Sequence, residues 1–142
     1  MSECEMYGVF IKQIHDELEK RTNNELRSED LTMAQVGTLV ILNRSPGERM
    51  PLKELERKLH VAQSTALGIV SRLERKGLVE CFGDPADRRV KTVQITGSGM
   101  SCCRMAVAHA KTAEERLLAG LTDEERAVFY TLLLKLCKSF KG

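Results

Sequence analysis

Hydrophobic periodicity changes abruptly at Gly77. In residues 63–76 the apolar side chains recur every three or four positions, as in a helix that packs one face on a core; they are Ala66, Ile69, Val70 and Leu73. After Gly77 the segments 78–82 and 91–95 are short and β-prone, and the residues between them are rich in turn formers and charge. This stretch therefore predicts a helix that ends at a glycine cap and is followed by a β-hairpin.

A shorter helix is predicted immediately before that one. Pro51 suits a helix start, and three leucines follow it at helical spacing: Leu52, Leu55 and Leu59. A break at residues 60–62 separates the two helices. Two short helices joined by a tight break and followed by a hairpin form a winged helix-turn-helix.

Longer helices are predicted on both sides of this unit. On the N-terminal side, apolar residues at helical spacing begin at Tyr7, and Thr-x-x-Gln at 32–35 has the form of a capping box that opens a second helix. On the C-terminal side a long helix follows Gly99 and ends near Gly120, and Thr-x-x-Glu at 122–125 opens a last helix. The predicted fold class is mainly α with a small β-hairpin wing.

The terminal helices carry more apolar surface than the small central unit can cover. Their apolar sides include Tyr7, Phe10, Ile11, Leu133, Leu136 and Phe140. In a monomer this surface would be a large exposed patch, so we expect a second copy to cover it; packing within one subunit is the alternative. We predict one domain over residues 1–142, in which 1–30 and 100–142 supply dimerisation helices and 31–99 form the winged helix-turn-helix lobe.

Charge is unevenly distributed along the chain. Residues 1–30 carry 4 Lys and Arg against 8 Asp and Glu, whereas residues 51–96 carry 9 against 6. The positive excess therefore falls on the winged unit, where a surface could meet phosphates.

The chain is 42% hydrophobic and 30% charged, which is a soluble, globular balance. It has no export signal and no apolar run near the roughly 18 residues of a membrane span, so we expect a cytoplasmic protein with no membrane partner.

Catalysis and metal binding find little support in the sequence. The three histidines, His15, His60 and His109, are scattered, and we find no glycine-rich phosphate loop or paired catalytic motif, so no enzyme activity and no cofactor is predicted. The five cysteines are Cys4, Cys81, Cys102, Cys103 and Cys137. Their odd number and the lack of C-x-x-C spacing argue against a structural zinc site, and a reducing cytoplasm argues against disulfides.

The second helix of the winged unit has an outer face suited to DNA. The major groove is about 12 Å wide and admits one α-helix, which the preceding helix braces across the backbone. Small polar groups gather at the N-terminal end of this face and two arginines follow further along. The face comprises Gln63, Ser64, Thr65, Leu67, Gly68, Ser71, Arg72 and Arg75.

The chain resembles the MarR (multiple antibiotic resistance regulator) family over nearly its whole length. The similar segments are STALGIVSRLERKGLVE at 64–80, DPADRRVKTVQIT at 84–96 and LTDEERAVFYTLLLKLCK at 121–138. The resemblance implies a DNA-binding transcriptional regulator, expected to act as a repressor, whose first and last helices intertwine in a homodimer. A two-fold dimer implies an inverted-repeat operator in duplex DNA.

The resemblance also implies roles for particular residues. Asp87 and Arg89 stand at the family's Asp-x-Arg wing motif, in which the arginine enters the minor groove, and we expect Arg88 to point toward a phosphate. The family often holds a small-molecule pocket between the dimer region and the DNA-binding lobe, commonly for a phenolic or other aromatic acid. We expect its lining to include Tyr7, Phe10, Ile11, Ile14 and Met33.

Two alternatives to a ligand-responsive regulator stay open at this point. The first is thiol-based redox sensing, because Cys4 lies in the region where thiol-sensing relatives carry a reactive cysteine; its neighbours Glu3 and Glu5 would raise the thiol pKa and oppose that role. The second is a winged-helix protein-interaction module that does not bind DNA. Basic residues on both the second helix and the hairpin tip favour DNA.

Overall fold

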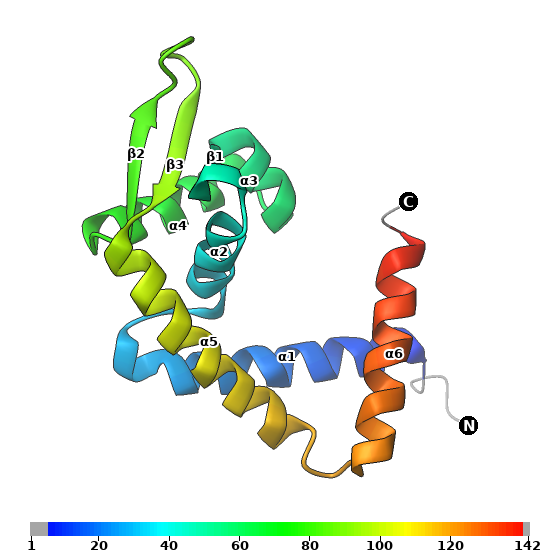
Figure 1. The fold of residues 1–142 in the computed structure, drawn as a ribbon. Helices are drawn as coiled ribbons and strands as arrows, with labels where there is room; N and C mark the ends of the chain where they lie inside the picture. The colour runs from blue at the N-terminus through cyan, green and yellow to red at the C-terminus, as the bar shows by residue number, and fades with distance from the viewer. Residues whose placement is uncertain (1–5, 141–142) are drawn as a thin grey trace.

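The computed structural model describes residues 6–140 (Figure 1). In chain order the elements are α1 (Tyr7–Leu26), η1 (Arg27–Glu29), α2 (Met33–Asn43), η2 (Pro46–Glu48), β1 (Arg49–Pro51), α3 (Leu52–Leu59), α4 (Gln63–Arg75), β2 (Val79–Gly83), β3 (Lys91–Ile95), α5 (Gly97–Leu117) and α6 (Asp123–Ser139). The mainly helical fold with a winged helix-turn-helix is therefore confirmed.

Both predicted capping boxes form at helix starts. The Thr32 hydroxyl accepts from the Gln35 backbone N–H at 3.3 Å, and the Thr32 backbone N–H donates to Gln35 Oε1 at 3.2 Å. Thr122 and Glu125 make the same reciprocal pair at 3.1 and 2.9 Å. These bonds satisfy backbone donors that have no partner inside the helix, which fixes where α2 and α6 begin.

The predicted hairpin belongs to a three-stranded antiparallel sheet with the order β1-β3-β2. The short strand β1 was not predicted; it places Met50 opposite Val93 on the buried face. Pro51 fits this edge strand because a proline cannot donate to a ladder. Pro51 also precedes the first residue of α3, so its predicted place at a helix start is confirmed.

The junction between α4, the sheet and α5 is held by two glycines. Gly77 has a φ of 74° and ends α4, with the Leu78 backbone N–H donating to the Leu73 carbonyl. Helix α5 begins at Gly97, earlier than predicted, because the Thr96 hydroxyl accepts from the Gly99 N–H at 3.0 Å. A Cβ at Gly99 would overlap the Leu78 carbonyl oxygen, so only glycine permits this close approach.

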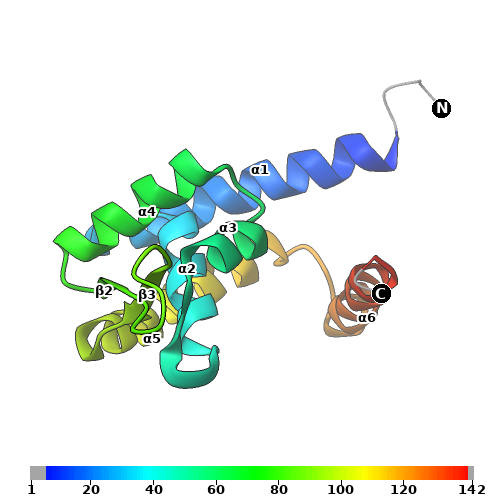
Figure 2. The ribbon, with the colours of Figure 1, turned by 90° about the horizontal axis from the view of Figure 1, so that it is seen from above.

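The buried core lies within the winged lobe and at its contact with α5. It gathers side chains from α2, α3, α4, the sheet and α5, and its fully buried members include Leu39, Leu42, Leu55, Leu73 and Val93. Figure 2 shows α4 on the outside of the lobe with α2 and α3 beside it. The recognition face of α4 is therefore mounted on a packed scaffold.

The two ends of the chain make different contacts. The C-terminal half of α1 packs along α5, whereas α6 buries none of its residues and stands away from the lobe (Figure 1). Large apolar side chains of α6 are consequently exposed; they include Val128, Leu132, Leu133, Leu134 and Leu136. Within the described part of the chain, packing inside one subunit does not cover this helix.

Candidate nucleic-acid interface

Helix α4 separates an apolar inner face from a polar outer face. Its four predicted core residues are buried, and every residue predicted to read DNA on this helix is exposed except Gly68, which is half-buried. A Cβ built at Gly68 meets no atom within 4 Å, so the fold itself does not require glycine there. No side chain caps the first turn of α4, which leaves backbone N–H groups free beside Gln63 and Ser64.

The turn between α3 and α4 sets the position of the recognition helix. His60 adopts a left-handed conformation, with φ of 56° and ψ of 43°, and its N–H donates to the Arg57 carbonyl at 3.2 Å. The Val61 N–H reaches the Glu56 carbonyl at 3.3 Å. This tight reversal explains the predicted break at residues 60–62 and lets α3 brace α4.

The hairpin tip holds Arg89 against Asp87. Arg89 Nε donates to Asp87 Oδ1 at 3.1 Å, and the Arg89 backbone N–H donates to the same oxygen at 3.0 Å. The arginine side chain is 93% exposed, and the hairpin projects from the lobe in Figure 1. A charged, planar group is thus presented outward with its orientation set by a neighbouring carboxylate.

The bonds from Arg89 also hold the pKa of the Asp87 carboxyl below its ordinary value of 3.8, the side-chain bond contributing more than the backbone bond. The contact is therefore present at neutral pH and is lost only as the pH falls through that lowered pKa. Wing geometry should not depend on pH in the neutral range. Arg88, the residue between the pair, is exposed.

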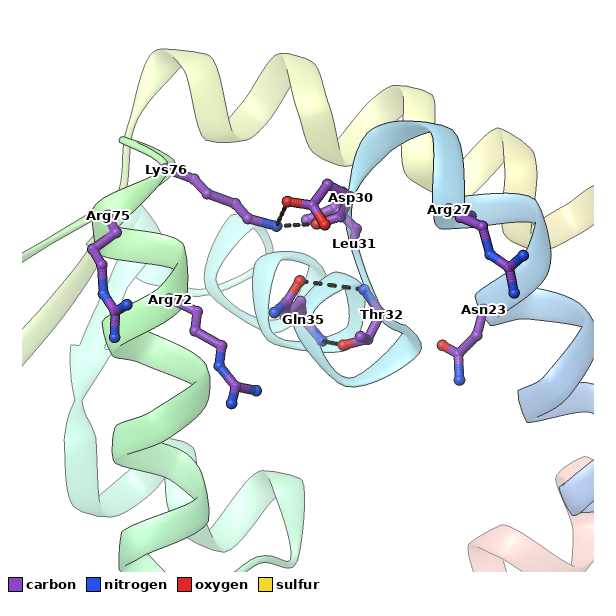
Figure 3. A pocket seen from close by; sticks show the side chains of 9 residues that line it. All are labelled: Asn23, Arg27, Asp30, Leu31, Thr32, Gln35, Arg72, Arg75 and Lys76. Carbon is purple, nitrogen blue, oxygen red and sulfur yellow. Dashed lines mark hydrogen bonds and ion pairs between the residues drawn. The ribbon is translucent and has the colours of Figure 1, made fainter.

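Arg72 and Arg75 lie beside a cleft that the sequence did not predict. This cleft of about 600 Å³ separates the C-terminal half of α4 from the corner between α1 and α2 (Figure 3). Its lining comprises Asn23, Arg27, Asp30, Leu31, Thr32, Gln35, Arg72, Arg75 and Lys76. These residues come from two distant stretches of sequence, 23–35 and 72–76, so no local pattern could have revealed their convergence.

The residues predicted for an effector pocket are not gathered into one cavity. Ile14 lines an apolar groove of about 680 Å³ between α1, the end of α5 and α6. Tyr7, Phe10 and Ile11 are exposed on α1, and Met33 stands at the start of α2. Within one subunit this set does not enclose a ligand, and the effector pocket stays a prediction.

Thiol and metal chemistry gain no support from the described residues. Burial raises the pKa of Cys81, Cys102 and Cys103, whereas a reactive thiol needs a lowered pKa. Cys4, the candidate for redox sensing, lies outside the described residues. Between residues 6 and 140 no three His, Cys, Asp or Glu side chains are grouped to hold a metal ion, and no helix there is long and apolar enough to cross a membrane.

Comparison with known proteins finds one family. Residues 31–91 match the model of the MarR family. The HTH-type transcriptional repressor NicR of Pseudomonas putida is 34% identical over 110 residues, which cover 77% of this chain and 68% of NicR. The uncharacterized HTH-type regulator YsmB of Bacillus subtilis is 32% identical over 92 residues, covering 65% of this chain and 63% of YsmB.

Solved structures agree with the sequence matches. The crystal structure of a mutant MarR from E. coli complexed with operator DNA superposes with a TM-score of 0.78 at 26% identity, covering 91% of each chain. The fold, the winged helix-turn-helix and the match to NicR together show that this chain belongs to the MarR family of transcriptional regulators.

Proposed function

We propose that the protein regulates transcription by binding an inverted-repeat operator in duplex DNA as a homodimer. In this proposal α4 enters the major groove with Gln63, Ser64 and Thr65 nearest the bases, and the wing reaches the adjacent minor groove. Residues 31–99 form the DNA-binding lobe, and 1–30 with 100–142 supply the dimerisation helices. NicR is a repressor, which favours repression here.

The observation that carries the proposal is the wing tip. Arg89 is almost fully exposed, and three hydrogen bonds to Asp87 orient it. A flexible arginine loses side-chain entropy when it inserts into a groove, and a carboxylate that holds it beforehand reduces that loss. A guanidinium in this pose suits the negative potential of a narrow A·T-rich minor groove.

Dimerisation is supported by the exposed apolar side chains at both chain ends. Leu133 and Leu136 on α6, and Phe10 and Ile11 on α1, are between 46% and 62% exposed in the single chain. The groove lined by Ile14, Val128 and Leu132 is also open and apolar. A second copy that covered these faces would remove the patch from water and hold two lobes at a fixed spacing.

In this proposal the protein acts on DNA in the cytoplasm and carries out no enzymatic step. A small aromatic or phenolic effector remains part of the regulator hypothesis. Redox sensing is not proposed, because the described cysteines with shifted pKa values are all shifted upward. A protein-interaction module is also not proposed, since binding to a protein partner would not require Arg89 to be held outward by Asp87.

Selection of bound duplexes from a random library tests the proposal. We expect an inverted repeat with half-sites about one helical turn, roughly 10 bp, apart. Thr65→Ala and Arg72→Ala should each weaken binding to the selected site by about 1–3 kcal/mol. Recovery of no preferred sequence, or unchanged affinity in both variants, would show that α4 does not read DNA.

A further inference from the structure

The cleft between α4 and the α1–α2 corner concentrates positive charge. Arg72, Arg75 and Lys76 line one wall, Arg27 lines the other, and Asp30 is the only acid among the lining residues (Figure 3). Lys76 is already engaged with Asp30, because its Nζ donates to the Asp30 carbonyl and lies 3.5 Å from Asp30 Oδ2. Within residues 6–140 the three arginines have no ion-pair partner, so the cleft attracts an anion.

A buried polar group also faces this space. Gln35 is only 5% exposed, and its Oε1 accepts from the Thr32 N–H, which turns its amide nitrogen toward α4 in Figure 3. That nitrogen is a hydrogen-bond donor at the floor of the cleft. The backbone N–H groups of Met33 and Gln35 are taken by Asn23 and Thr32, so these two groups are not available to a ligand.

The lining favours a compact oxyanion over an aromatic ligand. Leu31 is the one large apolar residue among the nine that line the cleft, and none of the nine is aromatic. A flat ring would therefore find no stacking surface here. Guanidinium groups are planar and bond bidentately to phosphate and carboxylate oxygens, so three of them around one space match such a group.

The position of the cleft on α4 identifies the source of the oxyanion. From Ser64 to Arg72 the helix rises about 12 Å at 1.5 Å per residue, which is about the width of the major groove. A helix whose first turn meets base edges therefore brings Arg72 to the rim of the groove, where the backbone phosphates lie. Arg27 stands across the cleft, and within the described part of the chain its guanidinium donates only to Asn24 Oδ1, at 3.1 Å.

We propose that this cleft binds a DNA backbone phosphate between Arg72 on the recognition helix and Arg27 at the end of α1. The inference rests on the DNA-binding function proposed above and extends the contact surface beyond the winged helix onto the dimerisation helix. A phosphate held from both walls fixes the lobe against α1, which sets the angle at which α4 enters the groove. The Lys76–Asp30 contact holds the same two walls together without DNA.

The test is the salt dependence of DNA affinity for Arg27→Gln. Each phosphate contact contributes about 0.9 to the slope of log affinity against log salt, so a two-fold dimer with one such contact per subunit should lose about 1.8. We expect this loss on both a selected operator and a mixed-sequence duplex, because a phosphate contact carries no sequence information. Arg27→Lys should restore the slope.

Lys12→Gln is the matched control, since it removes one positive charge from an exposed site on α1, where among the described residues Lys12 pairs only with Asp16. Its slope should equal that of the wild type. Thermal unfolding of each variant, followed by circular dichroism, checks the fold; Arg27 is exposed, so we expect no change in the melting temperature.

Three results would overturn the proposal. Wild-type slope in Arg27→Gln would show that Arg27 holds no phosphate across the cleft from Arg72, which overturns the proposal, while the DNA-binding function itself would stand. Saturable binding of inorganic phosphate to the DNA-free protein, lost in Arg27→Gln without a change in the DNA slope, would assign the cleft to a free anion. Failure of the wild type to bind any duplex would remove the proposed function together with this inference.

Discussion

Helices α4 and α6 are both amphipathic, but the apolar face is buried in α4 and exposed in α6. The apolar face of α4 is buried by its own chain, and its exposed face is polar apart from Leu67. Helix α6 buries nothing, and its leucines remain about half exposed. The difference indicates that the lobe buries its apolar core within one subunit, whereas the apolar faces of the terminal helices are buried only in a dimer.

Deletion of residues 122–142 should have the largest effect. It removes α6 and with it the proposed dimer contact, so we expect a monomer with no measurable affinity for a two-half-site operator. The lobe should stay folded, because no core residue lies on α6. Sedimentation and circular dichroism measure the two properties separately. If the full-length protein sediments as a monomer at micromolar concentration, α6 is not a dimerisation helix.

Two leucine substitutions test whether α4 and α6 are buried by different partners. Leu73 is fully buried, so Leu73→Ala should reduce the free energy of unfolding by about 2–5 kcal/mol at any protein concentration. Leu133 is 46% exposed in the single chain, so the effect of Leu133→Ala should depend on concentration through the dimer equilibrium. Denaturation measured at several protein concentrations distinguishes them. Equal, concentration-independent losses would contradict the account.

Arg89→Ala tests whether the wing contacts DNA. Loss of the proposed minor-groove contact should weaken operator binding by about 1–3 kcal/mol. The free energy of unfolding should hardly change, because the side chain is 93% exposed and contacts only Asp87. Fluorescence anisotropy with a labelled operator gives the affinity. An unchanged affinity would mean that the wing does not touch DNA.

Gly68→Ala should give a smaller effect with opposite signs in two assays. Alanine stabilises a helix interior by up to about 1 kcal/mol relative to glycine, and a Cβ at Gly68 has open space around it. The variant should therefore unfold at a slightly higher temperature and bind DNA more weakly, because the added methyl group would meet the groove. Tighter DNA binding would place Gly68 away from the interface.

Features set by neighbouring residues could be predicted from sequence. Both capping boxes, the start of α4 at Gln63 and strand β3 agree with prediction, because each follows from a local pattern of side chains and backbone donors. The contact of Asp87 with Arg89 is equally local, since only one residue separates them.

Features that depend on distant partners could not be predicted. Strand β1 is three residues long, and its pairing with β3 spans some forty positions of chain. The charged cleft joins Arg27, Gln35 and Arg72, which no sequence period connects. Gly99 carries no local sign that it must approach the Leu78 carbonyl. Each of these requires the fold to be assembled first.

The most direct test of the account is the operator affinity of Asp87→Ala at matched salt. Simple electrostatics predicts tighter binding, because the change removes a negative charge beside DNA. We expect weaker binding, because the carboxylate that orients Arg89 is lost. Affinity below that of the wild type, with no change in the melting temperature, would support the orienting role. Affinity above that of the wild type would contradict that role and would show that the wing contributes only its positive charge to DNA binding.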